Sequence, residues 1–239
     1  MENDNPKPEI IFEDNHLLVA VKPSGILSQA DRTGEPDMLS LLKADLKERY
    51  GKPGDVYLGL LHRLDRPVRG VMIFAKTSKC ASRLSAQIRE RSFEKKYRAI
   101  VNGSIAPERG TLHSAILKDH ETNTSTVFEP GKAPEEAKDS VLLYETTGQA
   151  IIREGGKYMP ITMLDIRLIT GRPHQIRAQL ADAGNPILGD KKYGDISGYR
   201  GDICLEAYNI ALRHPIRNER MEFNLPMPGA GPWLLFEKG

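Results

Sequence analysis

Hydrophobic positions along this chain form short continuous runs in some segments and a three-to-four-residue repeat in others. Residues 10–12 and 17–21 are apolar runs on either side of a turn-prone tetrapeptide, which predicts a β-hairpin. Residues 58–61 and 71–75 are two further runs. Their short length, and the Val, Ile and Phe content of the second, favour strands over helices.

Two segments carry the helical repeat instead. Residues 37–50 predict a helix with Asp37 as its N-cap, and residues 77–91 predict another that begins at Thr77 or Ser78. The apolar positions that repeat are Leu39, Leu42, Leu46, Ala81, Leu84 and Ile88. Each set lies on one face, so we expect both helices to pack against a core.

The second half of the chain is less regular. We expect a strand at residues 95–101, hairpins between 119 and 160, and a helix with Pro173 in its first turn that ends at Gly184. The other expected strands are residues 124–128, 140–146, 161–169, 203–212 and 220–225. Strands among two or three helices, without a steady βαβ rhythm, indicate an α+β fold with a mixed or antiparallel sheet.

Length and composition set broad limits. A chain of 239 residues is long enough for a sizeable core and favours one domain, or two. Residues 1–9 lack the apolar core of an export signal, so we expect a mobile tail followed by one domain at 10–239. No apolar run approaches the ~18 residues of a membrane span. Cys80 and Cys204 are too few and too far apart for a disulfide framework or a zinc site, which predicts a cytoplasmic protein.

Charge is unevenly distributed. The net charge is only +2, but residues 63–98 contain eleven Lys or Arg and three Asp or Glu. Such a concentration is typical of a phosphate-binding surface. A solvated helix face whose counter-charges come from elsewhere in the fold explains it equally well.

The polar insert at residues 62–70 separates two of the apolar runs and contains Asp65 among Arg63, Arg66 and Arg69. A carboxylate among cations stays ionised and is suited to act as a nucleophile or an electrostatic stabiliser. The plainer interpretation is a solvated surface ion pair. Spacing alone does not decide between them.

The amino-acid sequence of this insert and the strand after it also resembles a known family motif. HRLDRPVRGVMIFAKT resembles the motif HRLD(K/R)xTSGLLxxAKT of the RluA-like RNA pseudouridine synthases, and VKPSG at 21–25 resembles their NKPxG segment. The resemblance implies that Asp65 is the catalytic aspartate and that Arg63 enters the RNA where the target uridine is flipped out. Val68 and Arg69 stand where the family usually has Thr and Ser.

Two later segments extend the resemblance. KKYRAIVNG resembles KxYxAxVxG, which implies that Tyr97 lies beside the flipped base, although strand tyrosines more often serve only in packing. GRPHQIRAQLADAGNPILGDKKYG resembles GRTHQIRVHLxxxGxPIxGDxxYG, which implies that Arg177 is the basic residue that pairs with Asp65. Without the resemblance, HQIR at residues 174–177 would be read only as the start of an amphipathic helix. Pro173, Gln179 and Glu206 depart from the family's usual Thr, His and His, whereas His214 matches.

The resemblance runs from about Glu9 to Pro228 and implies the pseudouridine synthase fold, a mixed, mostly antiparallel central sheet flanked by helices, with an active-site cleft. It implies an isomerase that converts a specific uridine of rRNA or tRNA to pseudouridine, with no cofactor, no metal and no membrane partner. We expect a cytoplasmic monomer without the S4-type RNA-binding domain of many relatives. The alternatives are a catalytically silent RNA-binding module on the same scaffold and a nucleoside hydrolase that uses Asp65.

Overall fold

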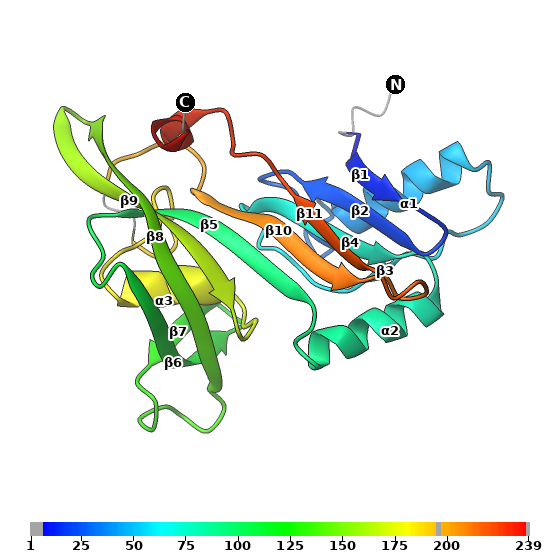
Figure 1. Ribbon diagram of the computed structural model, residues 1–239, viewed down its shortest axis with the longest axis horizontal. Helices are drawn as coiled ribbons and strands as arrows, with labels where there is room; N and C mark the ends of the chain where they lie inside the picture. The colour runs from blue at the N-terminus through cyan, green and yellow to red at the C-terminus, as the bar shows by residue number, and fades with distance from the viewer. Residues whose placement is uncertain (1–6, 195–196, 238–239) are drawn as a thin grey trace. The chain divides into compact units, whose positions relative to one another are not determined.

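The computed structural model describes residues 7–194 and 197–237, which divide between two compact units (Figure 1). The first unit comprises the described residues of Met1–Lys95 and Ala207–Leu225, and the second those of Lys96–Glu206 and Pro226–Gly239. Of the tail expected at residues 1–9, the first six lie outside the described residues, and Glu9 already begins a strand.

The sheet of the first unit has the strand order β1-β2-β4-β10, with β3 paired to β4 and β11 paired to β10. The strands are β1 (Glu9–Glu13), β2 (Leu17–Lys22), β3 (Gly59–Leu60), β4 (Arg69–Ala75), β10 (Leu205–Arg213) and β11 (Arg220–Asn224). The predicted β1–β2 hairpin is confirmed. Strand β3 is only two residues long, shorter than its apolar run. In the antiparallel β2–β4 pair, Lys22 lies opposite Gly70 at the end of the ladder.

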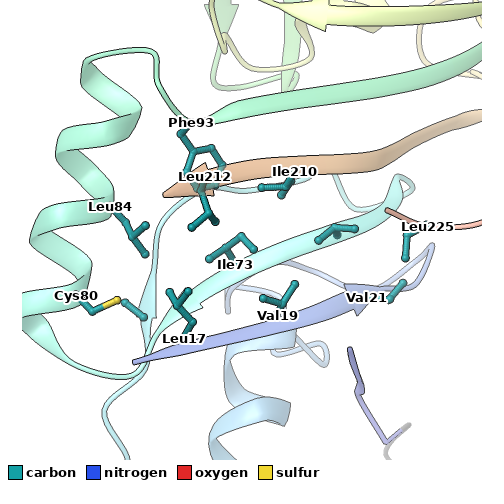
Figure 2. Close-up of a cluster of buried hydrophobic side chains, with 12 residues drawn as sticks. Leu17, Val19, Val21, Ile73, Cys80, Leu84, Phe93, Ile210, Leu212 and Leu225 are labelled. Atoms are coloured by element: carbon teal, nitrogen blue, oxygen red, sulfur yellow. The ribbon is translucent and has the colours of Figure 1, made fainter. Parts of the chain in front are cut away.

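Strands β2 and β4 are buried on both faces, which explains why their sequences are continuously apolar. One set of side chains, including Val19 and Ile73, packs with Cys80 and Leu84 of helix α2 (Ser78–Arg89) in the cluster of Figure 2. The intervening residues, such as Phe74, are equally inaccessible to solvent. These strands therefore form the centre of the first unit.

Two helices accompany this sheet, and both begin at the predicted caps. Helix α1 (Met38–Arg49) begins after Asp37, whose carboxylate accepts a hydrogen bond from the Ser40 N–H at 3.0 Å. Helix α2 (Ser78–Arg89) begins after Thr77, whose hydroxyl accepts a hydrogen bond from the Cys80 N–H. These side-chain oxygens satisfy amides that have no partner inside the helix.

The sheet of the second unit has the order β5-β9-β8-β6-β7, and each neighbouring pair is antiparallel. Its strands are β5 (Glu94–Asn102), β6 (Arg109–Asp119), β7 (Thr124–Phe128), β8 (Lys138–Glu154) and β9 (Lys157–Leu168). The α+β prediction is confirmed. Strand β8 is far longer than the predicted residues 140–146, because it continues through a bulge between Thr146 and Gly148 and keeps pairing with β9.

Helix α3 (Gln175–Asp182) and the short 3-10 helix η1 (Gly231–Phe236) complete the second unit. The prediction that Pro173 lies in the first turn of α3 is wrong. The helix begins two residues later, because His174 has a left-handed backbone with φ of 54°. The Pro173 carbonyl instead accepts a hydrogen bond from the Ser125 hydroxyl at 2.8 Å.

Candidate active site

Asp65 lies in the turn between β3 and β4, and an earlier segment, residues 22–28, holds the main chain on both sides of it. The Ser28 hydroxyl donates to the carbonyl of Leu64 at 2.8 Å and accepts from the Leu64 N–H at 3.0 Å. The Ser24 hydroxyl donates to the carbonyl of Pro67 at 3.0 Å. Because these bonds involve only main-chain atoms of the turn, they set the position of Asp65 without using its carboxylate.

Lys22 is a fully buried cation beneath the same turn. Its Nζ donates to the carbonyls of Pro23 at 2.9 Å, Ile26 at 2.6 Å and Arg66 at 2.8 Å. Burial lowers the pKa of Lys22 to about 7, and the negative charge of Asp65 opposes that shift. The three carbonyls favour the ammonium form, because only that form supplies three N–H donors.

The arginines around Asp65 have different surroundings. Arg66 is tied back to the earlier segment, because its Nε donates to the carbonyl of Gly25 at 3.0 Å and its guanidinium pairs with Glu35. Arg63 is exposed, and Arg69 is half-buried at the start of β4. Of these, the exposed Arg63 has the side chain best placed to meet a ligand from solvent.

His62 is a neutral histidine within this turn. Its Nε2 accepts a hydrogen bond from the Ile73 N–H at 3.1 Å, and its ring lies beside Phe93. Burial holds the pKa of His62 well below its usual range. Because Nε2 is the acceptor, the proton is on Nδ1, which has no hydrogen-bond partner within the described parts of the chain. The main role of His62 is to join the turn to β4.

The family's Thr and Ser positions are filled here by Val68 and Arg69. Val68 is buried, and its N–H donates to the carbonyl of Asp65 at 2.9 Å, so the main-chain turn closes without a hydroxyl. Gly70 follows and has no substitute. A Cβ at this position would lie 2.5 Å from the Cβ of Ala207 and 2.6 Å from its carbonyl oxygen.

In the second unit, Arg177 of α3 is buried in an ion pair with Asp190. Its Nε and Nη2 donate to the two carboxylate oxygens at 2.8 and 2.7 Å. The guanidinium also lies over the ring of Tyr193, 5.1 Å from its centroid. The partner Asp190 was not predicted from the sequence, because no rule of spacing connects a helix residue to a loop residue thirteen positions later. The predicted pairing of Arg177 with Asp65 stays a prediction.

Tyr193 also contacts the residue that precedes α3. Its hydroxyl accepts a hydrogen bond from the Ser125 N–H at 2.8 Å and lies 2.8 Å from Nδ1 of His174. The left-handed backbone of His174 is uncommon for a residue with a side chain. Tyr193 therefore contacts both Arg177 and His174, and it links them to strand β7.

Tyr97 lies on β5, where it is buried with 7% exposure and pairs with Ile166 of β9. Its neighbour Arg98 pairs with Glu206, another residue at which this chain departs from the family. Glu206, which replaces the usual His, is buried and accepts hydrogen bonds from Arg98 at 2.5 Å, and the Arg98 guanidinium lies over the ring of Trp233. The second unit thus supplies its own partner for the unusual acid.

The predicted site residues fall into two sets. Asp65 and Arg63 share a turn of the first unit, and Tyr97 and Arg177 belong to the second. Sequence analysis missed Lys22, Asp190 and Tyr193. Each lies in a segment that resembles the family, VKPSG or GDKKYG, and that was the available signal. Within residues 7–194 and 197–237, no His, Cys, Asp and Glu group is arranged to hold a metal ion, and no helix is long and apolar enough to cross a membrane.

The sequence matches the family described as RNA pseudouridylate synthase over residues 16–182. The dual-specificity RNA pseudouridine synthase RluA of Pasteurella multocida is 31% identical over 228 residues, which cover 93% of this chain and 94% of that protein. Ribosomal large subunit pseudouridine synthase C of Vibrio parahaemolyticus is 32% identical over 91% of this chain and 65% of its own length. The uncharacterized RNA pseudouridine synthase YhcT of Bacillus subtilis is 30% identical over 92% and 68%, respectively.

Solved structures agree on the fold. The human RNA pseudouridylate synthase domain-containing proteins 1 and 4 each match with a TM-score of 0.73 and 23% identity over 92% of this chain. The match covers 84% of the first of these chains and 89% of the second.

Proposed function

Because the chain belongs to the RNA pseudouridylate synthase family, we propose that Asp65 is its catalytic residue and that Arg63, Tyr97 and Arg177 bind the substrate RNA. The protein is an RNA pseudouridine synthase, an isomerase of uridine in RNA. The assignment of Asp65 rests on the hydrogen bonds that fix the main chain of its turn. The carbonyls of the residues on both sides of Asp65 accept hydrogen bonds from residues 22–28. Such fixed main-chain geometry is what a reacting carboxylate requires.

The reaction breaks the N1–C1′ bond of a uridine, turns the uracil and joins its C5 to C1′. In one route Asp65 attacks C1′ as N1 leaves, and C5 later displaces the carboxylate. In the other route Asp65 takes the C2′ proton as N1 leaves, which produces a glycal, and C2′ regains a proton from Asp65 when C5 bonds to C1′. In both routes C5 loses its hydrogen and N1 gains a proton. A uridine deuterated at C2′ separates the routes, since only the second breaks that C–H bond.

A uridine stacked in RNA is out of reach of a carboxylate, so the nucleotide must first be flipped out. Arg63 is exposed and lies two residues from Asp65, and it would fill the gap that the flipped uridine leaves. Tyr97 would offer its ring to the uracil, since stacking on an aromatic side chain contributes roughly 1–3 kcal/mol per base. Arg177, whose side chain Asp190 and Tyr193 fix, would bind the substrate RNA through its positive charge.

A tritium-release assay tests the function directly. RNA labelled at C5 of uridine should lose tritium to water when the protein isomerises the base. Release of free uracil instead would identify the hydrolase alternative. RNA binding with neither product would identify the silent module that the departures at Val68, Arg69 and Glu206 suggest.

The choice between rRNA and tRNA is part of the proposal. The relatives are named for both, as a ribosomal large subunit enzyme, a dual-specificity enzyme and a tRNA enzyme. Comparing pseudouridine maps of total RNA from a strain with and without this protein would identify the uridine. We also propose a cytoplasmic location, because Cys80 and Cys204 are buried thiols outside any disulfide, as in a reducing compartment. We further propose that the protein is a monomer. Analytical ultracentrifugation would test the oligomeric state.

A further inference from the structure

Helix α3 contacts one face of the β6–β8 pair. Ser114 of β6 lies opposite Ser140 of β8, and Gln179 of α3 donates to the Ser114 hydroxyl at 2.8 Å and to the Ser140 carbonyl at 3.2 Å. Two residues along the ladder, Ile116 lies opposite Lys138. Because strand side chains alternate between faces, this second pair shares the face of the first. Ile116 is buried there, whereas Lys138 is exposed.

A pocket of about 440 Å³ opens at this position, beside the turn that precedes α3. Its apolar lining residues are Ile116, which is buried, and the more accessible Leu117 and Pro173. Such a surface suits the flat, weakly polar faces of a ribose or a nucleobase better than it suits an ion alone. The pocket therefore has room for part of a nucleotide.

The polar part of this pocket is mostly basic. Lys118, Lys138 and Arg172 line it, and Glu136 is the one carboxylate among its lining residues. Neither Lys138 nor Arg172 forms an ion pair with any residue in the described ranges. Two cations that have no ion-pair partner in the described ranges, in the lining of one pocket, are suited to a phosphate.

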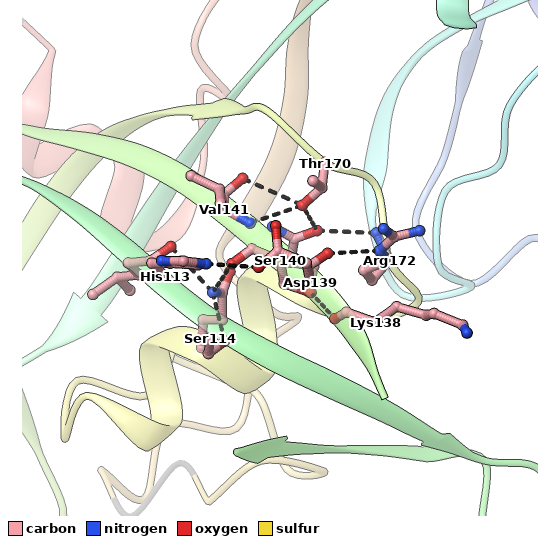
Figure 3. A network of polar contacts seen from close by, with 11 residues as sticks. His113, Ser114, Lys138, Asp139, Ser140, Val141, Thr170 and Arg172 are labelled. Carbon is pink, nitrogen blue, oxygen red and sulfur yellow. Dashed lines mark hydrogen bonds and ion pairs between the residues drawn. The ribbon is translucent and has the colours of Figure 1, made fainter. Parts of the chain in front are cut away.

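Arg172 is held in position before any ligand binds, as Figure 3 shows. Its Nε donates to the carbonyl of Asp139 at 2.9 Å, and its backbone N–H donates to Oε1 of Gln175 at 2.9 Å. The Thr170 hydroxyl fixes the same Oε1 at 2.8 Å. The Nε contact orients the guanidinium plane and leaves its two terminal nitrogens for a ligand, which reduces the entropy lost on binding.

The carboxylate of Asp139 does not neutralise this site. It lies 2.6 Å from Nε2 of His113. In the ladder Asp139 pairs with Ala115, so its side chain points to the face opposite that of Lys138. Figure 3 likewise shows the Lys138 side chain extending away from the network.

We propose that this pocket binds a backbone phosphate of the substrate RNA, at a nucleotide outside the target uridine, through Arg172 and Lys138. The proposal rests on the proposed function, because it takes RNA as the ligand. Its role is to fix the register of the RNA, since phosphate contacts position a nucleic acid without reading its sequence.

The test is the salt dependence of RNA binding. Affinity for a hairpin RNA with uridines in its loop is measured between about 50 and 200 mM salt. Each lost phosphate contact should flatten the slope of log affinity against log salt by about 0.7–0.9. Because both cations contact one phosphate, we expect about this full flattening for the double variant, and a smaller flattening for Arg172→Ala and for Lys138→Ala alone. Lys157→Ala, an exposed lysine of the same unit outside the pocket, is the matched control and should keep the wild-type slope.

A variant of opposite sign guards against simple loss of folding. Glu136→Lys adds a cation to the pocket, so it should tighten binding and steepen the slope. Wild-type slopes for Arg172→Ala, Lys138→Ala and Glu136→Lys would overturn the proposal, and so would equal flattening by the Lys157→Ala control. Tritium release by the wild-type protein is measured separately. If isomerisation fails while the slopes change as expected, the proposed function is wrong and the phosphate site stands.

Discussion

Asp65 and Arg177 are held in place by opposite means. The position of Asp65 is set through the main chain around it, because buried Lys22 and the serines of residues 22–28 bind carbonyl groups of its turn. The position of Arg177 is set through its own side chain. Its guanidinium forms two hydrogen bonds with the carboxylate of Asp190 and lies over the ring of Tyr193.

This difference separates the costs of substitution. A change at Asp65 leaves the bonds that hold its turn intact, so function can be lost while stability remains. A change at Arg177 or Asp190 leaves a charged group in the interior, where the Arg177 and Asp190 side chains are only 6% and 0% exposed. In the first unit, the bonds from residues 22–28 hold the turn without using the carboxylate of Asp65. In the second unit, the guanidinium of Arg177 itself forms the bonds that hold it in place.

The largest effect on stability should come from breaking the Arg177–Asp190 pair. Asp190→Ala removes the bidentate partner of a buried guanidinium, which typically costs roughly 3–5 kcal/mol of unfolding free energy. Urea unfolding measures this loss. Asp182→Ala, which removes an exposed carboxylate at the end of the same helix, is the control and should change stability little. A loss for Asp190→Ala no larger than the control's would show that the pair does not secure Arg177.

Lys22→Met should have the next largest effect. Methionine fills the space but donates no hydrogen bond, so three carbonyls lose their donor, and each buried group left unpaired costs roughly 1–3 kcal/mol. We expect a total loss of roughly 2–3 kcal/mol, since solvent can reach part of the turn. Lys47→Met on the exposed side of α1 is the control. Unchanged stability would mean that residues 22–28 do not hold the turn through Lys22.

The same lysine predicts a pH dependence. Its pKa is about 7 in the folded protein and higher in the unfolded chain, where burial no longer lowers it. At pH values between the two, the unfolded chain binds more protons, so the free energy of unfolding rises with pH through this window. Urea unfolding of wild type and Lys22→Met is measured at about pH 6.5 and about pH 9, roughly the two ends of the window between the two pKa values. The difference in unfolding free energy between the two proteins should be larger at the higher pH. A constant difference would mean that the carbonyls keep Lys22 protonated throughout.

Tyr193→Phe should have the smallest effect on stability. The ring stays over Arg177, but the Ser125 N–H loses its acceptor and His174 loses its contact, which should cost roughly 1 kcal/mol. Tyr158→Phe is the matched control, because Tyr158 is exposed and its ring also lies beside an arginine, Arg153. If Tyr193→Phe equals this control, the hydroxyl does not anchor His174.

Sequence reasoning identified elements whose signals are local. The continuous apolar residues of β2 and β4, and the caps Asp37 and Thr77, depend only on neighbours in the chain. The length of β8 could not be predicted, because its continuation depends on pairing with β9 through a bulge. The start of α3 was misjudged because the left-handed backbone of His174 depends on tertiary contacts.

The candidate site divides in the same way. Asp65, Arg63, Tyr97 and Arg177 were proposed from their place in family-like segments. Their partners were not, because the contacts form between distant segments: Lys22 meets the carbonyl of Arg66 forty-four residues later. A motif identifies a reactive residue, whereas the residues that hold it must be found in the fold.

We predict that Asp65 performs the isomerisation and contributes little to stability. Asp65→Asn keeps the shape of the side chain and removes its charge. Tritium release from C5-labelled uridine RNA should fall to background, while urea unfolding should give a free energy within about 1 kcal/mol of wild type. Multiple turnovers by purified, folded Asp65→Asn would contradict the claim.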